Sequence, residues 1–207
     1  MVDQRSPGNS SEGLDQDQSD RAMAEDALAA LIRSAGAAAG LRPVDTWAPP
    51  YCGDIGLAIR GDGVWMYQAS PIGRQALVKL FASILRKDAD CKTYLVTPAE
   101  KVDVQVADAP FLAVEMAVTG AGKAQSLTFR TNVDDVVTVD RAHPLRFERQ
   151  DPAGGLKPYV IVRGRLEALV TRAVYADIVE LAVAGAGQAG TDGALGVWSG
   201  GLWWELE

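Results

Sequence analysis

The stretch PYVIVRGRLEALVTRAVYADIVELA, residues 158–182, contains two apolar runs, a tight turn and an amphipathic helix in succession. Residues 159–163 and 165–170 are rich in branched apolar side chains, which is typical of strands, and Gly164 permits a sharp reversal between them. From Thr171 onward the apolar residues recur at helical spacing instead. The order predicts a hairpin whose sheet is capped by a helix. The apolar face of that helix comprises Val174, Tyr175, Ile178, Leu181 and Ala182.

Short strand-like segments also precede this stretch. Residues 102–106 alternate strictly between valine and polar side chains, as a strand with one buried face does. Similar runs lie at residues 111–118, 126–131, 136–139 and 145–149. Together with the hairpin they predict a strongly bent antiparallel sheet or small barrel with a capping helix, and an α+β fold for the chain.

The N-terminal part repeats the order of hairpin and helix. Residues 55–60 and 64–68 predict a hairpin around Gly61-Asp62-Gly63. A helix is predicted to begin at Ser70-Pro71, because serine favours the N-cap and proline the first helical position. Its apolar stripe comprises Leu77, Leu80, Phe81, Ile84 and Leu85.

That helix is predicted to end at Arg86 and Lys87, whose charges suit a helix C-terminus. A further strand is predicted at residues 92–97. Counted from Ser70 and Thr171, the two helices have matching apolar positions, which predicts that the halves are related by duplication.

Composition divides the chain into four parts. Residues 1–20 are rich in Ser, Gly, Gln and Asp and predict a disordered acidic tail. Residues 21–98 form the predicted N-terminal α+β domain, which opens with a helix containing Met23, Ala27, Leu28, Leu31 and Ile32. Residues 99–184 form the predicted C-terminal domain, and residues 185–207 a Gly- and Trp-rich segment that is expected to add a strand or plug.

Charge and hydropathy exclude several classes of partner. The chain has a net charge of −7, and no cluster of Lys and Arg marks a surface for nucleic acid or anionic lipid. It contains no secretory signal pattern and no apolar run of the roughly 20 residues that span a bilayer. Cys52 and Cys91 form no CxxC pair and are expected to be buried, unreactive thiols. We therefore expect a cytoplasmic protein with neither nucleic-acid nor membrane partners.

No catalytic or metal-binding pattern stands out. Gly185–Gly190 reads GxGxxG but follows a helix, whereas a dinucleotide fold requires a preceding strand. His143 is the single histidine, and no serine or cysteine lies in a nucleophile motif. Asp134, Asp135 and Asp140 lack the spacing of a calcium loop or zinc site. The sequence predicts no catalytic residue, cofactor or metal.

An anion site has a modest physical basis. The predicted helix starts present free backbone N–H groups, and Arg74 and Arg172 lie near them. Arg163 lies on the strand before the second helix, and the ring of Tyr67 or of Trp65 would stack on a base. Ion pairs to Asp54, Asp62 or Glu167 remain the structural alternative for these arginines. The candidate ligand-binding set is Arg74, Arg163, Arg172, Tyr67, Asn132 and His143.

Several motifs over residues 45–182 together resemble a known family. They are 47–55 (WAPPYCGDI), 62–67 (DGVWMY), 70–74 (SPIGR), 77–81 (LVKLF), 131–132 (TN), 143–145 (HPL) and 158–163 (PYVIVR), with Arg172 and Tyr175 beyond. They resemble the proteobacterial domain of unknown function 1285. The resemblance implies a duplicated α+β core, a C-terminal half similar to a pleckstrin-homology fold, a ligand site between the halves for a nucleotide-like molecule, and a role in signalling. It implies no reaction and no catalytic residues.

Three interpretations follow. The first is a non-enzymatic module that binds a small, nucleotide-like anion between the halves. The second is an enzyme on a nucleotide-like substrate, with His143 as base and Asn132 or Asp135 orienting the substrate. The third is a protein-interaction module that uses a sheet edge or the tryptophans near the C-terminus, where a homo-oligomer contact is the simplest form.

Overall fold

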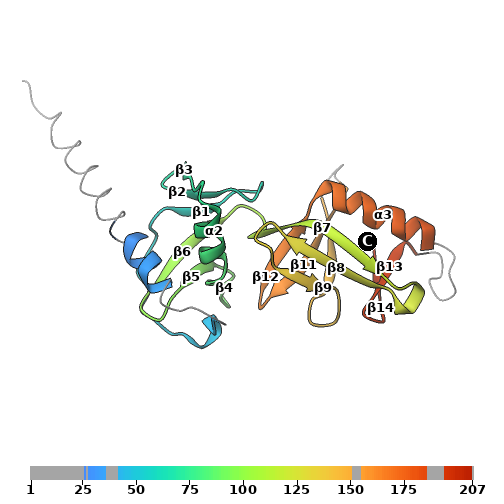
Figure 1. The fold of residues 1–207 in the computed structure, drawn as a ribbon, viewed down its shortest axis with the longest axis horizontal. Coiled ribbons are helices and arrows are strands. Elements are labelled where there is room, and N and C mark those ends of the chain that lie inside the picture. Colours follow the sequence, from blue (N-terminus) through green and yellow to red (C-terminus); the bar gives the residue numbers. More distant parts are fainter. Residues whose placement is uncertain (1–25, 27, 36–41, 151–154, 186–193, 207) are drawn as a thin grey trace, which may run out of the picture.

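The computed structural model describes residues 26, 28–35, 42–150, 155–185 and 194–206. Within them, two six-stranded sheets and a two-stranded hairpin combine with helices, as the α+β prediction requires (Figure 1). The elements are η1 (Val44–Thr46), β1 (Leu57–Ile59), β2 (Trp65–Tyr67), β3 (Ser70–Pro71), α2 (Gln75–Ala82), β4 (Leu85–Lys87), β5 (Thr93–Val96), β6 (Lys101–Val106), β7 (Phe111–Thr119), η2 (Gly122–Ala124), β8 (Ser126–Thr131), β9 (Val136–Thr138), β10 (Leu145–Arg149), β11 (Leu156–Arg163), β12 (Leu166–Val170), α3 (Arg172–Gly185), β13 (Gly196–Ser199) and β14 (Leu202–Glu205).

The first sheet has the strand order β3-β2-β1-β6-β5-β4, and its single parallel pair joins β1 to β6. Strand β6 lies beyond the expected boundary at residue 98, so the first sheet extends to Val106. Helix α2 packs on this sheet through Phe81, whose ring centroid is 6.1 Å from that of Trp65. Both side chains are almost completely buried.

The second sheet repeats the connectivity of the first. Its order is β10-β11-β12-β7-β8-β9, with β7 parallel to β12. In each sheet one antiparallel three-stranded unit follows another, and the last strand of the second unit pairs in parallel with the first strand of the first unit. The prediction of two related halves is therefore confirmed at the level of topology. The second half is a bent sheet capped by α3, as expected.

The start predicted for the first helix is wrong. Ser70–Pro71 is the edge strand β3, which pairs with Met66 and Tyr67. An edge strand tolerates proline because its missing N–H needs no partner, so this dipeptide is compatible with both structures. Helix α2 begins only at Gln75, with Arg74 at its N-cap.

The helix-to-helix match on which the duplication was predicted is also wrong. Helix α2 follows the third strand of its half, whereas α3 follows the sixth strand of the other. The end of α2 differs too, because the helix stops at Ala82, and Arg86 and Lys87 lie on β4. The short apolar run Ile84-Leu85 suits a buried strand as well as a helix, so its spacing does not decide between them.

Helix α3 and its buried face are confirmed: Val174, Ile178 and Ala182 lie in the core. Beyond it, Ser199 fixes the C-terminal hairpin β13–β14. The buried Ser199 Oγ accepts a hydrogen bond from Leu127 N at 2.9 Å and donates one to Val139 O at 2.7 Å.

Several predictions lie outside the described residues. These are the tail 1–20, the helical positions Met23 and Ala27, and the glycine-rich motif after Gly185. Residues 28–35 are helical, with Leu31 completely buried. None of the helices in the described ranges has the length and apolar character needed to cross a bilayer.

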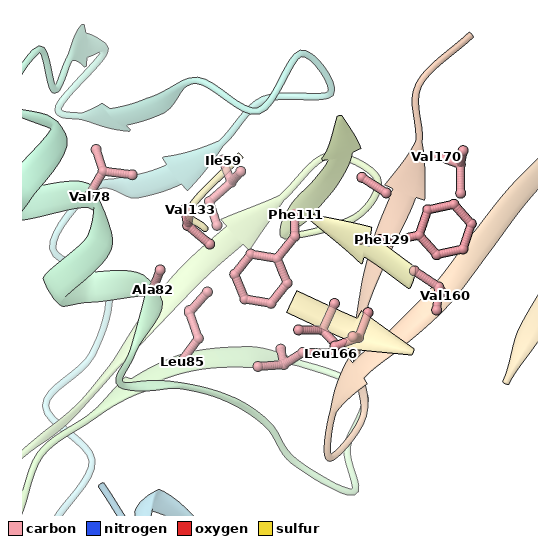
Figure 2. Packing of buried hydrophobic residues seen from close by; sticks show 14 of the residues in the cluster. Ile59, Val78, Ala82, Leu85, Phe111, Phe129, Val133, Val160, Leu166 and Val170 are labelled. Carbon is pink, nitrogen blue, oxygen red and sulfur yellow. The ribbon is translucent and has the colours of Figure 1, made fainter. Parts of the chain in front are cut away.

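One apolar core runs through both halves. Figure 2 shows Phe111, at the start of β7, between Ala82 and Leu85 of the first half and Leu166 of the second. The Phe111 side chain is completely buried. Because strands β4 and β12 also contact each other, the two sheets pack as one unit.

The two halves approach each other closely at Gly63, in the β1–β2 turn, and a substitution at this position tests that contact. Its φ is +78°, and a Cβ there would lie 2.9 Å from Leu112 Cδ1 of the second half. We expect Gly63→Ala to lower the free energy of unfolding by about 2 kcal/mol in urea denaturation, because both backbone strain and crowding oppose it. Gly61→Ala is the matched control, since a Cβ at that position would have no neighbour within 4 Å. Equal losses in the two variants would contradict this account.

Candidate functional site

The seam between the halves is centred on Arg163. Its Nη1 lies 2.6 Å from Asp135 Oδ2, and its Nη2 donates a hydrogen bond to Ala82 O at the end of α2. The guanidinium also lies 5.1 Å from the centroid of the Phe111 ring. A helix leaves its last carbonyls without helical partners, so this arginine satisfies one of them from the other half.

The β8–β9 loop forms the rest of the polar seam. Lys79 of α2 pairs with Asp134, and Gln75 Nε2 donates to Asn132 O at 3.2 Å. The amide of Asn132 accepts a hydrogen bond from Leu112 N at 3.0 Å. Hydrogen bonds from Lys79, and then from Arg130, hold the pKa of the Asp134 carboxyl below its usual value. Asn132 therefore has a structural role at this contact.

A cleft of about 230 Å³ opens beside Arg163, and we call it the seam cleft. Its walls come from η1 and β4 of the first half and from the β11–β12 turn of the second. They contain four cations and one carboxylate, although the whole chain has a net charge of −7. The lining residues are Val44, Asp45, Leu85, Arg86, Lys87, Arg163, Gly164, Arg165 and Leu166.

A second cleft, of about 480 Å³, adjoins the first, and we call it the connector cleft. The two share Asp45, Arg86 and Lys87, which therefore lie where the clefts adjoin. The connector cleft adds the half-buried indole of Trp47 and the side chain of Lys101. The seam cleft thus offers cations, and the adjoining connector cleft offers an aromatic face.

Arg86 holds the connector in place. Its Nη1 donates to Val44 O and Trp47 O, each at 2.7 Å, and its Nε lies 2.5 Å from Asp88 Oδ1. The hydrogen bond from Arg86 is the main cause that holds the pKa of the Asp88 carboxyl below its usual value; Lys101 also lowers it, while burial opposes. Arg86 is thus committed to the fold.

Lys87 and Arg165 are in a different position. Arg165 Nη1 donates to the backbone oxygen Asp88 O at 3.3 Å. Within the described ranges, no carboxylate lies at ion-pair distance from either side chain. These two cations are therefore available to an anion that enters the seam cleft.

The predicted ligand residues do not converge on one point. Of the six, Arg163 lines the seam cleft and Asn132 lies at the seam. Arg74 is exposed at the N-cap of α2 and lines neither cleft. Arg172 is exposed at the start of α3, and Tyr67 packs against the core from β2.

His143 likewise lines neither cleft. It lies between β9 and β10, with its Nδ1 3.2 Å from Asp140 Oδ1. The neighbouring aspartates are each engaged elsewhere, Asp134 with Lys79 and Asp135 with Arg163. Over the described residues, no group of three or more His, Cys, Asp or Glu side chains forms a metal site.

The acids expected as alternative partners of the candidate arginines have other partners in the structure. Glu167 pairs with Arg146 at 2.6 Å and Asp62 with Arg60 at 2.9 Å. Asp54 accepts a hydrogen bond from Gln105 Nε2 at 2.9 Å. These acids therefore do not hold Arg74, Arg163 or Arg172.

Sequence reasoning misses the cleft cations on β4. In the sequence, Arg86 and Lys87 are readily explained as the positive charges at the end of a helix, so nothing there indicates a cleft. The sequence signal that indicates the cleft is Arg163-Gly164-Arg165, in which a tight turn presents two cations together.

The expected burial of the thiols is also wrong: Cys52 and Cys91 are exposed, because both lie in loops rather than in strands.

Comparison with family models matches residues 42–109 to the N-terminal domain of unknown function DUF1285 and residues 110–206 to the C-terminal DUF1285 domain. A crystal structure of a DUF1285 family protein from Silicibacter pomeroyi DSS-3 is 43% identical, with a TM-score of 0.75, and the match covers 85% of this chain and 93% of that one. Another, from Shewanella baltica OS155, is 28% identical with a TM-score of 0.48, covering 60% of this chain and 91% of that one. No curated protein matches the chain.

Arg163→Ala tests the seam. We expect it to lower the free energy of unfolding by about 2 kcal/mol, since it leaves Asp135 and the carbonyl of Ala82 without their charged partner. Arg141→Ala, at an exposed site, should change stability little. A double-mutant cycle with Asp135→Asn should show coupling between the two positions, and strictly additive effects would contradict the interaction.

Asp88 gives a pH-dependent prediction. Because its pKa is lowered in the folded protein, its ionised form stabilises the fold above the unfolded-state pKa of about 3.9. Asp88→Asn should therefore be less stable than the wild type by about 1 kcal/mol at pH 7, measured in urea. The difference should disappear as the pH falls through the folded pKa. Asp62→Asn, at an exposed site, is the control. A stability difference between the wild type and Asp88→Asn that persists in acid would contradict this account.

Proposed function

This chain belongs to the DUF1285 family, and we propose that it is a non-catalytic module that binds a small, nucleotide-like anion between its halves. The observation that carries the proposal is the concentration of four cations in the seam cleft of an acidic protein. A phosphate group there would meet Lys87 and Arg165, which have no carboxylate partner in the described ranges. Arginine offers paired N–H donors to such a group.

The size of the two clefts supports a phosphate attached to a larger body. The seam cleft alone is smaller than most organic ligand sites, which range over about 300–1,000 Å³. The connector cleft adjoins it and presents Trp47, whose ring is suited to stacking on a base. A nucleotide oriented in this way would place its phosphate between the halves and its base against the connector.

The same arrangement favours binding over chemistry. His143 lines neither cleft, and no nucleophile motif is present in the sequence. A module that binds a nucleotide-like signal without converting it would act as a sensor in signal transduction. A cytoplasmic location is part of this proposal.

Calorimetric titration of the full chain with adenosine 5′-monophosphate tests the proposal. We expect Lys87→Gln and Arg165→Gln each to weaken binding at least tenfold, because each removes one charged contact worth about 1.5–3 kcal/mol. Trp47→Leu should reduce the advantage of the nucleotide over inorganic phosphate. The control is Arg74→Gln, whose side chain lies outside both clefts.

Two results would refute the assignment. One is unchanged affinity in both Lys87→Gln and Arg165→Gln. The other is loss of binding in Arg74→Gln, which would move the site to the start of α2. Circular dichroism of each variant would show that the fold is retained, since Lys87 is only half-buried.

A further inference from the structure

A groove of about 870 Å³ runs along α3, and we call it the α3 groove. Its walls are α3 on one side and strands β11 and β12 on the other. It shares no lining residue with the seam or connector cleft. Residues that line it include Leu112, Leu156, Pro158, Leu169, Tyr175 and Val179.

Helix α3 contributes apolar side chains both to the core and to this groove. Helix α3 buries Val174, Ile178 and Ala182 against the second sheet. Tyr175, which packs against the edge of the core, and Val179 are half-buried and also line the groove. The two side chains therefore leave apolar surface exposed along one wall of the groove, and such surface can mark a ligand-binding groove.

The charge in the groove is uneven. Arg172 lies at the start of α3 beside Thr171, and its guanidinium has no ion-pair partner among the residues that the structure describes. Lys157 is already paired with Asp108 at 2.8 Å. Glu180 lies about 12 Å further along the helix, at 1.5 Å per residue. One end of an apolar groove is therefore positive and the other negative.

We propose that the α3 groove binds a long-chain carboxylate. The carboxylate would lie against Arg172 and the N-terminal end of α3, where the helix dipole favours an anion. The acyl chain would extend along Tyr175 and Val179 and be covered by Leu156 and Leu169. The volume lies within the usual range for small-molecule sites, and this site is independent of the function proposed above.

Titration of the full chain with octanoate, decanoate and dodecanoate tests the acyl part. We expect affinity to rise about fourfold for each methylene added, because each is removed from water. Ala176→Trp should abolish binding, since Ala176 is exposed and lines the groove. The control is Ala173→Trp, on an exposed position of the same helix that does not line the groove.

The head group is tested separately. Arg172→Gln should weaken dodecanoate binding about tenfold and leave the binding of dodecanol unchanged. Lys87→Gln should bind dodecanoate as the wild type does. Failure of the α3-groove proposal is therefore distinguishable from failure of the nucleotide proposal.

Three results would overturn the inference. The first is equal dodecanoate affinity in Ala176→Trp and Ala173→Trp. The second is affinity that does not depend on chain length. The third is a wild-type chain that binds no dodecanoate but forms a dimer that Ala176→Trp dissociates, which would make the groove a contact between copies. Sedimentation velocity of the same samples measures that outcome.

Discussion

The joining of the two halves depends on the guanidinium of Arg163. It lies on the ring of Phe111, pairs with Asp135 and satisfies a carbonyl at the end of α2. These three contacts come from different parts of the chain, and the core beneath them is continuous between the sheets. A half-buried arginine is suited to this position because its planar group makes several directed hydrogen bonds at once.

The hollow at the seam follows from this joining. Each half repeats the same six-stranded connectivity, yet the two contribute unlike elements to the contact. The first half supplies the edge strand β4 with Lys87, and the second supplies the β11–β12 turn with Arg165. The two sheets are therefore alike in connectivity, whereas the cation cluster lies where they meet asymmetrically.

Much of the fold was predictable from local patterns. The alternation over 102–106, the turn at Gly164 and the apolar spacing after Thr171 each specify one structure, and each is confirmed. Ser70-Pro71 and Ile84-Leu85 suit two structures, and tertiary pairing placed Ser70, Pro71 and Leu85 in strands, with Ile84 in the turn before β4. The cleft was harder to predict, because Lys87 and Arg165 are far apart in sequence and only the packing of the halves brings them together. The family resemblance correctly indicated two halves, and Arg163 was the candidate that reached the seam cleft.

The most direct test of the account is the movement of tryptophan indole N–H signals in NMR spectra when adenosine 5′-monophosphate is added. The chain has five tryptophans, of which Trp47 alone lines the connector cleft; Trp65 is buried under α2, and the others lie in the C-terminal hairpin. The account predicts that the Trp47 signal shifts while the other four remain in place. A Trp47 signal that stays fixed, or shifts confined to the hairpin tryptophans, would contradict a ligand site between the halves.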